Sequence, residues 1–172
     1  MTDRERIYQA LDSLGVAYER YTHAPAFHID QCEALAARFH ALICKNYFLS
    51  TRRKKDYCLC IVRPNARLRT SDISAQAGTS RLGFGSEEDL QALLRTRPGS
   101  VSPLGLLFDE DLRVRLLVDR ALVGEPRLAF HPCDNTETLV LSWADFAEKF
   151  LPAVRHAPTF VDVHDFGDLP ES

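Results

Sequence analysis

The sequence predicts a mixed α/β fold, in which helices surround a curled or barrel-like sheet of about seven strands that is mixed or largely antiparallel. Short alternating apolar runs recur along the chain, separated by segments with the apolar spacing of amphipathic helices. The links are short, which favours hairpins between neighbouring strands. Because there are no repeats and no linker, we expect one domain over 1–172, with 153–172 as an acidic tail.

Helices are predicted where a capping residue precedes an apolar repeat. Thr2 and Glu5 have the spacing of a capping box, and the apolar residues that follow recur at helical intervals until Gly15. Later helices are expected near 30–39, 71–77, 86–95 and 142–152. Their expected caps are Asp30 with Glu33, Ser71 or Asp72, Ser86 with Asp89, and Ser142 with Asp145.

Strands are expected over the short apolar runs between these helices, at 16–21, 41–50, 57–62, 81–84, 104–108, 113–118, 128–130 and 138–141. We expect 41–50 to pair with 57–62 across a cationic turn, and 104–108 to pair with 113–118 across an acidic turn. From His156 onward the chain has no lysine or arginine, and we expect this tail to be either a flexible end or a strap over the body.

The strand over 41–50 is unusual because Lys45 and Asn46 are adjacent within an apolar run. Burying an ammonium group without a partner costs several kcal/mol, roughly, so we expect Lys45 to meet a charge or a ligand. The alternative is an edge strand whose lysine reaches water. Because neighbouring strand residues face opposite ways, only one of the pair is expected to point into a given cavity.

Positive charge is concentrated in the middle of the chain, although the net charge is −3. Between Lys45 and Arg97 there are eleven lysines and arginines against five acids. Such a basic face can bind phosphates because screening limits the reach of distant acids to about 10 Å. The residues Arg52, Arg53, Lys54 and Lys55 are therefore either a nucleic-acid contact or an ordinary solvated turn.

The cysteines Cys32, Cys44, Cys58, Cys60 and Cys133 are odd in number and lack the spacing of a zinc site. We expect reduced thiols rather than a disulfide framework, and no metal or cofactor. The amino terminus is charged and lacks the apolar stretch of a secretion signal, and no run approaches the length of a membrane span. We therefore expect a cytoplasmic protein with no membrane partner.

No common catalytic motif is present, because GxSxG, HExxH, GxGxxG and the P-loop pattern are all missing. Two loops nevertheless contain groups that could take part in catalysis. The loop Gly99–Pro103 places a flexible and a rigid residue at its ends, which suits backbone N–H groups that face an anion or a carbonyl oxygen. The second loop carries His131 and Asn135 between two expected strands. Either loop alone could be an ordinary connection.

Taken together, three segments resemble one known family. They are Lys45-Asn46-Tyr47-Phe48-Leu49, then GSVSP with Gly105 close behind, then FHPCDNTETLVLS over 130–142. In order and spacing they are similar to the aminoacyl-tRNA deacylases that include the YbaK proteins and the editing domain of bacterial prolyl-tRNA synthetases. The LGFGSEEDL and LLVDRALV segments fit as well, so the resemblance covers about 1–152. Within the family, the Lys-Asn pair looks most like the freestanding alanyl-tRNA(Pro) deacylases.

The resemblance implies a trans-editing hydrolase that cleaves the ester of mischarged tRNA, with Ala-tRNA(Pro) as the expected substrate, by water attack without a covalent enzyme intermediate. Lys45 would bind the 3′-terminal phosphate or ribose, and Asn46 the aminoacyl carbonyl or amino group. Gly99 and Ser100 would present N–H groups to the ester, and His131 would position the reactants. The remaining implied contacts are Val101, Ser102, Pro103 and Asn135 around the substrate, and Arg52 to Lys55 along the acceptor stem.

Specificity is left open by the sequence. One methylene of fit is worth only about 1 to 3 kcal/mol, so small amino acids are hard to separate by size. His28 stands near a position where the family usually has a small hydroxyl residue, and it is a further candidate for the substrate pocket. The alternatives are a deacylase for cysteine or serine on tRNA, and a non-catalytic tRNA-binding module. Prolyl-tRNA synthetase is a candidate partner, and DNA is not expected to bind.

Overall fold

The computed structural model describes residues 1–25 and 29–165. Its helices are α1 (Asp3–Ser13), α2 (Ile29–Phe39), α3 (Thr70–Ala77), α4 (Glu87–Leu94), α5 (Trp143–Asp145) and α6 (Leu151–Ala153), with a π-helical segment over Phe146–Phe150 and 3₁₀ turns at Pro103–Phe108 and Arg120–Leu122. Its strands are β1 (Tyr18–Thr22), β2 (Leu42–Ile43), β3 (Lys45–Thr51), β4 (Tyr57–Val62), β5 (Ala66–Arg67), β6 (Leu82–Phe84), β7 (Val114–Asp119), β8 (Leu128–Phe130), β9 (Glu137–Leu141), β10 (Thr159–Val161) and β11 (His164–Asp165).

The strands form a four-stranded sheet in the order β1-β9-β8-β2, a five-stranded sheet in the order β10-β7-β4-β3-β6, and the small pair β11-β5. Antiparallel pairs are joined by three parallel ones, β2 with β8, β4 with β7, and β7 with β10. The mixed α/β class is therefore confirmed. The described residues form no closed barrel. The expected single strand over 41–50 divides at Cys44 and contributes β2 to one sheet and β3 to the other.

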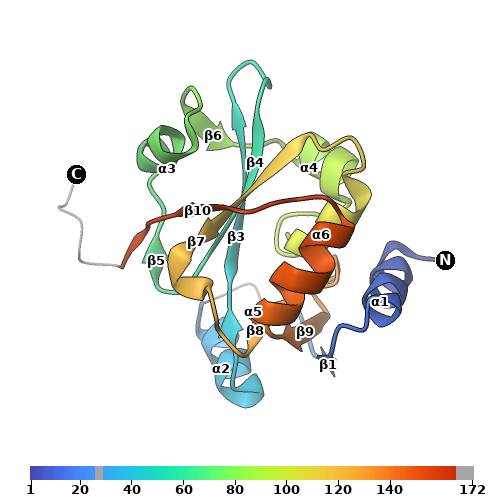
Figure 1. Cartoon of the computed structure of the whole chain (residues 1–172). Helices are drawn as coiled ribbons and strands as arrows, with labels where there is room; N and C mark the ends of the chain where they lie inside the picture. The colour runs from blue at the N-terminus through green and yellow to red at the C-terminus, as the bar shows by residue number, and fades with distance from the viewer. Residues whose placement is uncertain (26–28, 166–172) are drawn as a thin grey trace.

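The main core lies where the two sheets and the helices meet (Figure 1). Both faces of β4 are buried, since Tyr57, Leu59 and Ile61 join this main core whereas Cys58, Cys60 and Val62 join a second cluster with Ile73 of α3. A third, small cluster packs Phe39 of α2 on the four-stranded sheet. Covering a strand on both faces makes it the rigid centre of a sheet, and β3 is hydrogen-bonded to this centre along six residue pairs.

Elements that depend on neighbouring residues form as the sequence predicts. The capping box of Thr2 and Glu5 is formed, and β3 pairs with β4 as the predicted hairpin. The predicted first residues of the helices are less accurate. Helix α2 begins at Ile29, so Asp30 lies in its first turn instead of capping it, and α3 begins at Thr70, before both of its expected caps.

The predicted hairpin of 104–108 with 113–118 is wrong. Residues Pro103–Phe108 coil into a 3₁₀ helix, and β7 pairs in parallel with β4 instead. The reason is local, because Pro103 has its φ fixed at a helical value and the Ser102 hydroxyl accepts a hydrogen bond from the N–H of Leu104 at 3.1 Å. These two residues start a helical turn even though the residues after them are apolar enough for a strand.

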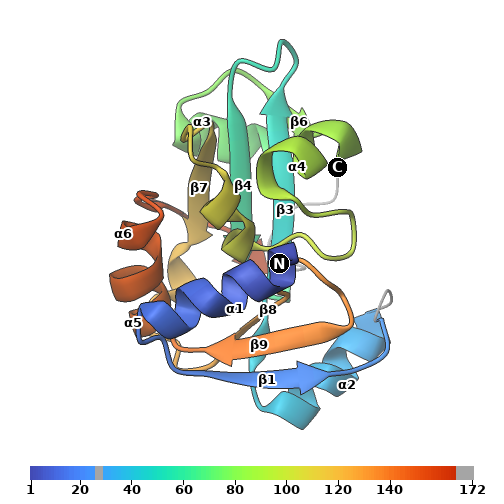
Figure 2. The same ribbon diagram turned by 90° about the vertical axis from the view of Figure 1, so that its right-hand side faces the viewer.

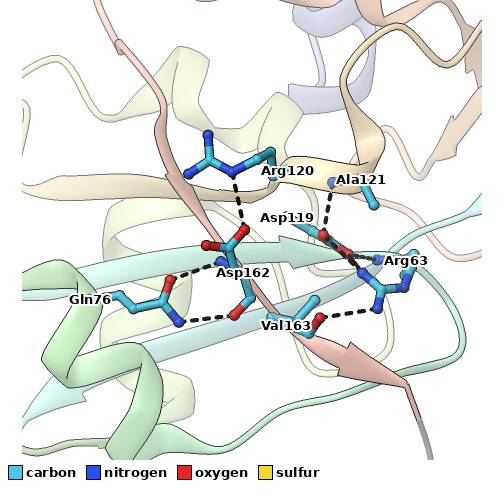
Figure 3. A network of polar contacts seen from close by, with 7 residues as sticks. All are labelled: Arg63, Gln76, Asp119, Arg120, Ala121, Asp162 and Val163. Atoms are coloured by element: carbon cyan, nitrogen blue, oxygen red, sulfur yellow. Dashed lines mark hydrogen bonds and ion pairs between the residues drawn. The ribbon is translucent and has the colours of Figure 1, made fainter. Parts of the chain in front are cut away.

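The described part of the acidic tail is a strap. Strand β10 adds to β7, and β11 pairs with β5. Polar contacts fix the strap to the body (Figure 3): Gln76 holds the backbone of Asp162, and the Arg63 guanidinium bonds both the Asp119 carboxylate, at 2.9 Å, and the carbonyl oxygen of Val163. Within the described ranges, no helix is both long and apolar enough to cross a membrane.

Candidate functional site

Lys45 and His131 follow two neighbouring parallel strands. Strand β2 pairs in parallel with β8, with Ile43 opposite Ala129. Lys45 comes two residues after β2, and His131 comes directly after β8. The carboxyl ends of neighbouring parallel strands lie at the same edge of a sheet. Lys45 and His131 therefore both follow this edge, where the chain passes from the four-stranded sheet into the five-stranded one.

Lys45 and Asn46 face opposite sides of β3. Lys45 is opposite Val62, which belongs to the second cluster, whereas Asn46 is opposite Ile61 of the main core. Lys45 is half-buried and lies near Cys32 of α2; burial raises the pKa of that thiol, and the lysine charge opposes the rise. Because the strand alternates regularly here, the two side chains lie on different faces of β3.

Asn46 carries an unsatisfied acceptor. Its Nδ2 donates to the carbonyl oxygen of Cys44 at 3.2 Å, while its Oδ1 is buried and receives no hydrogen bond from any described residue. A buried acceptor without a donor costs about 1–3 kcal/mol. Such a group requires a donor, which a water molecule or a ligand can supply.

The loop Gly99–Pro103 leaves at least two of its backbone N–H groups without an acceptor among the described residues. Gly99 has φ +91°, and the N–H of Ser100 closes a turn onto the carbonyl oxygen of Arg97 at 3.0 Å. Ser102 is fully buried and caps the following 3₁₀ turn. Within the described ranges, nothing accepts a hydrogen bond from the N–H groups of Val101 and Ser102. The backbone therefore retains donors at this loop.

Gly105 fixes this loop against α4. A Cβ atom at this position would lie 2.5 Å from the carbonyl oxygen of Leu94, which is closer than a real side chain could approach. The same carbonyl oxygen lies 3.9 Å from the Cys133 thiol, which belongs to the loop that carries His131. The end of α4 thus anchors both loops.

His131 is held as a neutral acceptor. Its Nδ1 lies 2.8 Å from the carbonyl oxygen of Glu137, and because a carbonyl can only accept, Nδ1 carries the proton. Burial lowers the pKa of His131, although the bond to Glu137 opposes the effect. The neutral ring therefore presents a lone pair on Nε2.

Sequence reasoning missed two residues that support His131. The His23 ring lies 6.1 Å from the His131 ring, and its Nε2 is 2.6 Å from the Thr138 hydroxyl. Glu137 is buried and bridges Arg4 of α1, at 2.8 Å, and Arg20 of β1, at 2.6 Å. Glu137 lies within the FHPCDNTETLVLS segment, but no pattern singles out either residue, because each role depends on pairing between strands far apart in the sequence.

All three predicted segments are next to, or pack against, the main core, and two of them share a pocket. Val101 and Cys133 pack on the main core, which also contains the immediate neighbours of the candidate residues, Cys44 and Phe130. Ser100 and Asn135 line one polar pocket of about 340 Å³, together with Arg95, Thr96 and Arg97. Figure 2 shows the loop after α4 and the loop leading into β9 on the same side of the molecule. Lys45 and Asn46 do not line this pocket.

The cationic turn lies at the other end of β3. Arg52, Arg53, Lys54 and Lys55 are exposed at the tip of the β3–β4 hairpin, which projects beyond the rest of the molecule (Figures 1 and 2). Lys54 pairs with Asp89 of α4 at 3.0 Å. Strand β3 is about 20 Å long at 3.3 Å per residue, so this tip is well separated from Lys45. His28 lies outside the described residues.

The chemistry available here is positioning and polarisation. Backbone donors, a carboxamide, an ammonium group and a neutral imidazole can orient a carbonyl and a water molecule. The thiols are poor nucleophiles, because burial raises the pKa of Cys133 to about 12 and also raises that of Cys44. The described residues contain no group of three or more His, Cys, Asp or Glu side chains arranged to hold a metal ion.

Comparison with known families decides what kind of protein has this arrangement. The model of the aminoacyl-tRNA editing domain matches residues 23–149, which include every candidate residue named above. The chain belongs to this family. The resemblance inferred from the three motifs is thereby confirmed, and with it the expected class of enzyme, a hydrolase that edits aminoacyl-tRNA.

Individual relatives agree with the family assignment. The prolyl-tRNA editing protein ProX of Acetoanaerobium sticklandii is 32% identical over 153 residues, covering 89% of this chain and 93% of the relative. The prolyl-tRNA synthetase associated domain-containing protein 1 of Mus musculus is 29% identical and covers 92% and 95%. A crystal structure provisionally described as a trans-editing enzyme for prolyl-tRNA synthetase superposes with a TM-score of 0.72 over 96% of this chain and 98% of its own. Its 15% identity shows the fold alone.

Proposed function

We propose that this member of the editing family hydrolyses the ester of Ala-tRNA(Pro) in trans. The tRNA is suggested by the ProX relative, which is named as a prolyl-tRNA editing protein. Alanine is suggested by the Lys45-Asn46 pair, which is similar to the freestanding alanyl-tRNA(Pro) deacylases. Prolyl-tRNA synthetase, the source of the mischarged tRNA, is a candidate partner.

The observation that carries this proposal is the unsatisfied Oδ1 of Asn46, on the face of β3 that packs toward the main core. A buried carboxamide acceptor suits the ammonium group of an esterified amino acid, which is a strong donor. Lys45, the neighbouring residue on the opposite face of β3, supplies a charge for the terminal phosphate or ribose. The substrate would thus be bound at both ends, amino acid on one side of β3 and nucleic acid on the other.

Water attacks the carbonyl carbon in the proposed reaction. The carbonyl becomes an oxyanion that the N–H groups of Val101 and Ser102 stabilise, because the N–H of Ser100 is already bonded to the carbonyl oxygen of Arg97. Gly99, Ser100 and Pro103 shape the loop that carries these donors. The bond to the ribose oxygen then breaks, the ribose oxygen takes up a proton, and alanine leaves as the free acid. His131 positions the water through Nε2, Asn135 supports the loop of His131, and no side chain becomes acylated.

Contact with the acceptor stem is assigned to the hairpin tip. Arg52, Arg53, Lys54 and Lys55 project far from the ester site, as the stem of a bound tRNA would. Neutralising several phosphates makes affinity fall steeply with salt, with a slope close to the number of contacts. We expect a hairpin variant lacking these charges to bind tRNA more weakly and to show a smaller salt slope.

The experiment is a panel of mischarged tRNAs. Purified protein should shorten the ester half-life of Ala-tRNA(Pro) far more than that of Cys-tRNA(Pro), Ser-tRNA(Pro) or correctly charged Pro-tRNA(Pro), without added metal or nucleotide. Lys45→Ala should nearly abolish release of alanine. Lys149→Ala should not, because Lys149 is an exposed lysine of the π-helical segment Phe146–Phe150. A preference for cysteine or serine would reassign the substrate.

Binding of tRNA without any change in ester half-life would instead establish the non-catalytic alternative. Equal activity of Lys45→Ala and the natural chain would overturn the role given to this strand.

A further inference from the structure

Phe84 is an exposed aromatic side chain on the edge of the five-stranded sheet. Its side chain is 71% exposed, and among the described residues it is the one aromatic in the set of exposed large apolar side chains. Strand β6, which carries it, is the outermost strand on the β3 side of the sheet. An aromatic ring exposed to this extent on a sheet edge is available to contact a partner.

The backbone holds Phe84 outward. Phe84 pairs with Leu49 across the ladder, and the next residue, Gly85, donates its N–H to the carbonyl oxygen of Phe48 at 2.9 Å. A Cβ atom on Gly85 would lie 2.3 Å from the Phe48 ring, so only glycine permits this close approach. The chain around Phe84 is therefore clamped to β3.

Phe84 lies in a row with Lys45. Residues 45, 47 and 49 of β3 face the same side, and Phe84 shares that side because it pairs with Leu49. The Tyr47 and Phe84 ring centroids are 6.2 Å apart. The row thus begins at the lysine assigned to the end of the tRNA, continues through Tyr47, and ends at the exposed ring.

Cations continue the row. The hairpin tip with Arg52 to Lys55 lies just beyond the point where β6 pairs with β3, and exposed Arg81 directly precedes β6. A planar apolar ring between positive charges matches the chemistry of single-stranded nucleic acid, whose bases stack on aromatic rings while its phosphates meet cations.

We propose that Phe84 is a stacking platform for an unpaired base in the 3′ strand of the charged tRNA, between the ester site and the stem contact at the hairpin. This inference rests on the proposed function, since it assumes that the tRNA end enters at Lys45. It adds a contact that depends on the shape of a base and not on the amino acid.

The test measures binding of two deacylated tRNA(Pro) transcripts, one intact and one lacking its unpaired 3′ nucleotides. Phe84→Ala should weaken binding of the intact transcript by about 5- to 150-fold, the range expected for loss of one stacked base, and should leave the truncated transcript within about twofold. Phe84→Trp should bind like the natural chain. Phe84→Leu, which is apolar but has no π face, should behave like Phe84→Ala.

Val123→Ala is the matched control, because Val123 is also an exposed apolar residue, at 49%, and it lies outside the row. The fold of each variant is checked by its thermal unfolding midpoint.

Each outcome has a defined meaning. If Phe84→Ala binds both transcripts like the natural chain, or if Phe84→Leu binds like phenylalanine, the platform is excluded while hydrolysis of Ala-tRNA(Pro) stands. If Phe84→Ala converts a dimer into a monomer in sedimentation, the ring serves a contact between two copies and the platform is excluded. If Phe84→Ala weakens binding of the intact transcript as expected but the natural chain cleaves no ester, the stacking platform stands and the proposed hydrolysis fails.

Discussion

His131 shows how one hydrogen bond determines the chemistry of a residue. Its Nδ1 proton is committed to the carbonyl oxygen of Glu137, so only Nε2 can act on a ligand. Burial lowers the pKa of the ring, and the nearby charge of His23, when protonated, acts in the same direction. The ring therefore remains neutral to a lower pH than a free histidine, whose pKa is about 6.5.

We predict that the acid limb of kcat/KM lies below pH 6.5 and depends on His131. As pH falls through the lowered pKa, Nε2 gains a proton and loses the lone pair, so activity falls. His131→Asn retains a donor for the carbonyl oxygen of Glu137 but lacks Nε2, and we expect a loss of about 5- to 10-fold, the value of one hydrogen bond. The measurement is a pH profile of both proteins. An unchanged acid limb in His131→Asn would assign it to another group.

At the scale of elements, the loops of the site are held by backbone contacts at the end of α4. The carbonyl oxygen of Leu94 faces Gly105 on one side and the Cys133 thiol on the other. A carbonyl in the backbone cannot swing away as a flexible side chain can. The spacing of the two loops therefore depends on the absence of a side chain at one position.

Gly105→Ala should consequently reduce both stability and activity. The new methyl group would lie 2.5 Å from the Leu94 oxygen, and overpacking of this kind costs typically about 1–3 kcal/mol. Urea unfolding measures the first effect and Ala-tRNA(Pro) hydrolysis the second. Gly83→Ala is the control, because a Cβ atom there meets nothing within 4 Å. If the two variants unfold at the same urea concentration, the clamp does not exist.

Elements defined by neighbouring residues could be predicted, and elements defined by distant pairing could not. The box of Thr2 and Glu5 and the β3–β4 hairpin depend on a few adjacent residues, and both are confirmed. The apolar run after Pro103 looks like a strand, but its first residues favour a helical turn. The parallel partner of β7 is β4, more than fifty residues away, and no local pattern encodes that register.

The same distinction applies to the site. The order and spacing of Lys45, the Gly99–Pro103 loop and His131 were visible in the sequence. The contributions of His23 and Glu137 were not, because both act through strands β1 and β9, which pair across more than a hundred residues. The assignment of catalytic roles stays a prediction.

At the scale of the whole molecule, the carboxyl-terminal strap links β7, α3 and β5 through the network in Figure 3. Two ion pairs in it differ in exposure. Arg120 and Asp162 are 60% and 71% exposed, whereas Asp119 is only 1% exposed where it meets Arg63. Exposed pairs contribute about 0–1 kcal/mol, but removing one partner of a buried pair costs about 3–5 kcal/mol.

We therefore predict that Arg63→Met lowers the free energy of unfolding by several times more than Asp162→Ala, since only the first leaves a buried carboxylate uncompensated. Guanidinium chloride unfolding of the two variants provides the comparison. Losses of similar size would mean that the strap is held mainly by its backbone pairing with β7.

A second long-range contact makes stability depend on pH. His156, which follows the last helix, is buried, and its Nε2 lies 2.9 Å from the Asp109 carboxylate. Asp109 also accepts from the N–H groups of Arg113 and Val114 at 3.0 and 2.9 Å. Burial alone would raise the pKa of Asp109, but the bonds from His156 and these two N–H groups together outweigh it, and the pKa is lowered.

A lowered carboxyl pKa stabilises the folded state only while the carboxylate is charged. The contribution of Asp109 is therefore complete above the unfolded value of about 3.9 and is lost as pH falls through the lower folded value. We predict that Asp109→Asn is less stable than the natural chain at pH 7 by about 1.5–3 kcal/mol, the value of a hydrogen bond to a charged group, because the bonds from His156 and the two N–H groups lose their charged acceptor. The difference should begin to shrink below about pH 4, where the unfolded chain takes up a proton at this position, and should vanish only below the lower pKa of the folded state. Thermal unfolding between pH 3 and 7 measures both effects, with the exposed Asp111→Asn as the control. A constant difference across that range would show that the carboxylate charge does not stabilise this contact.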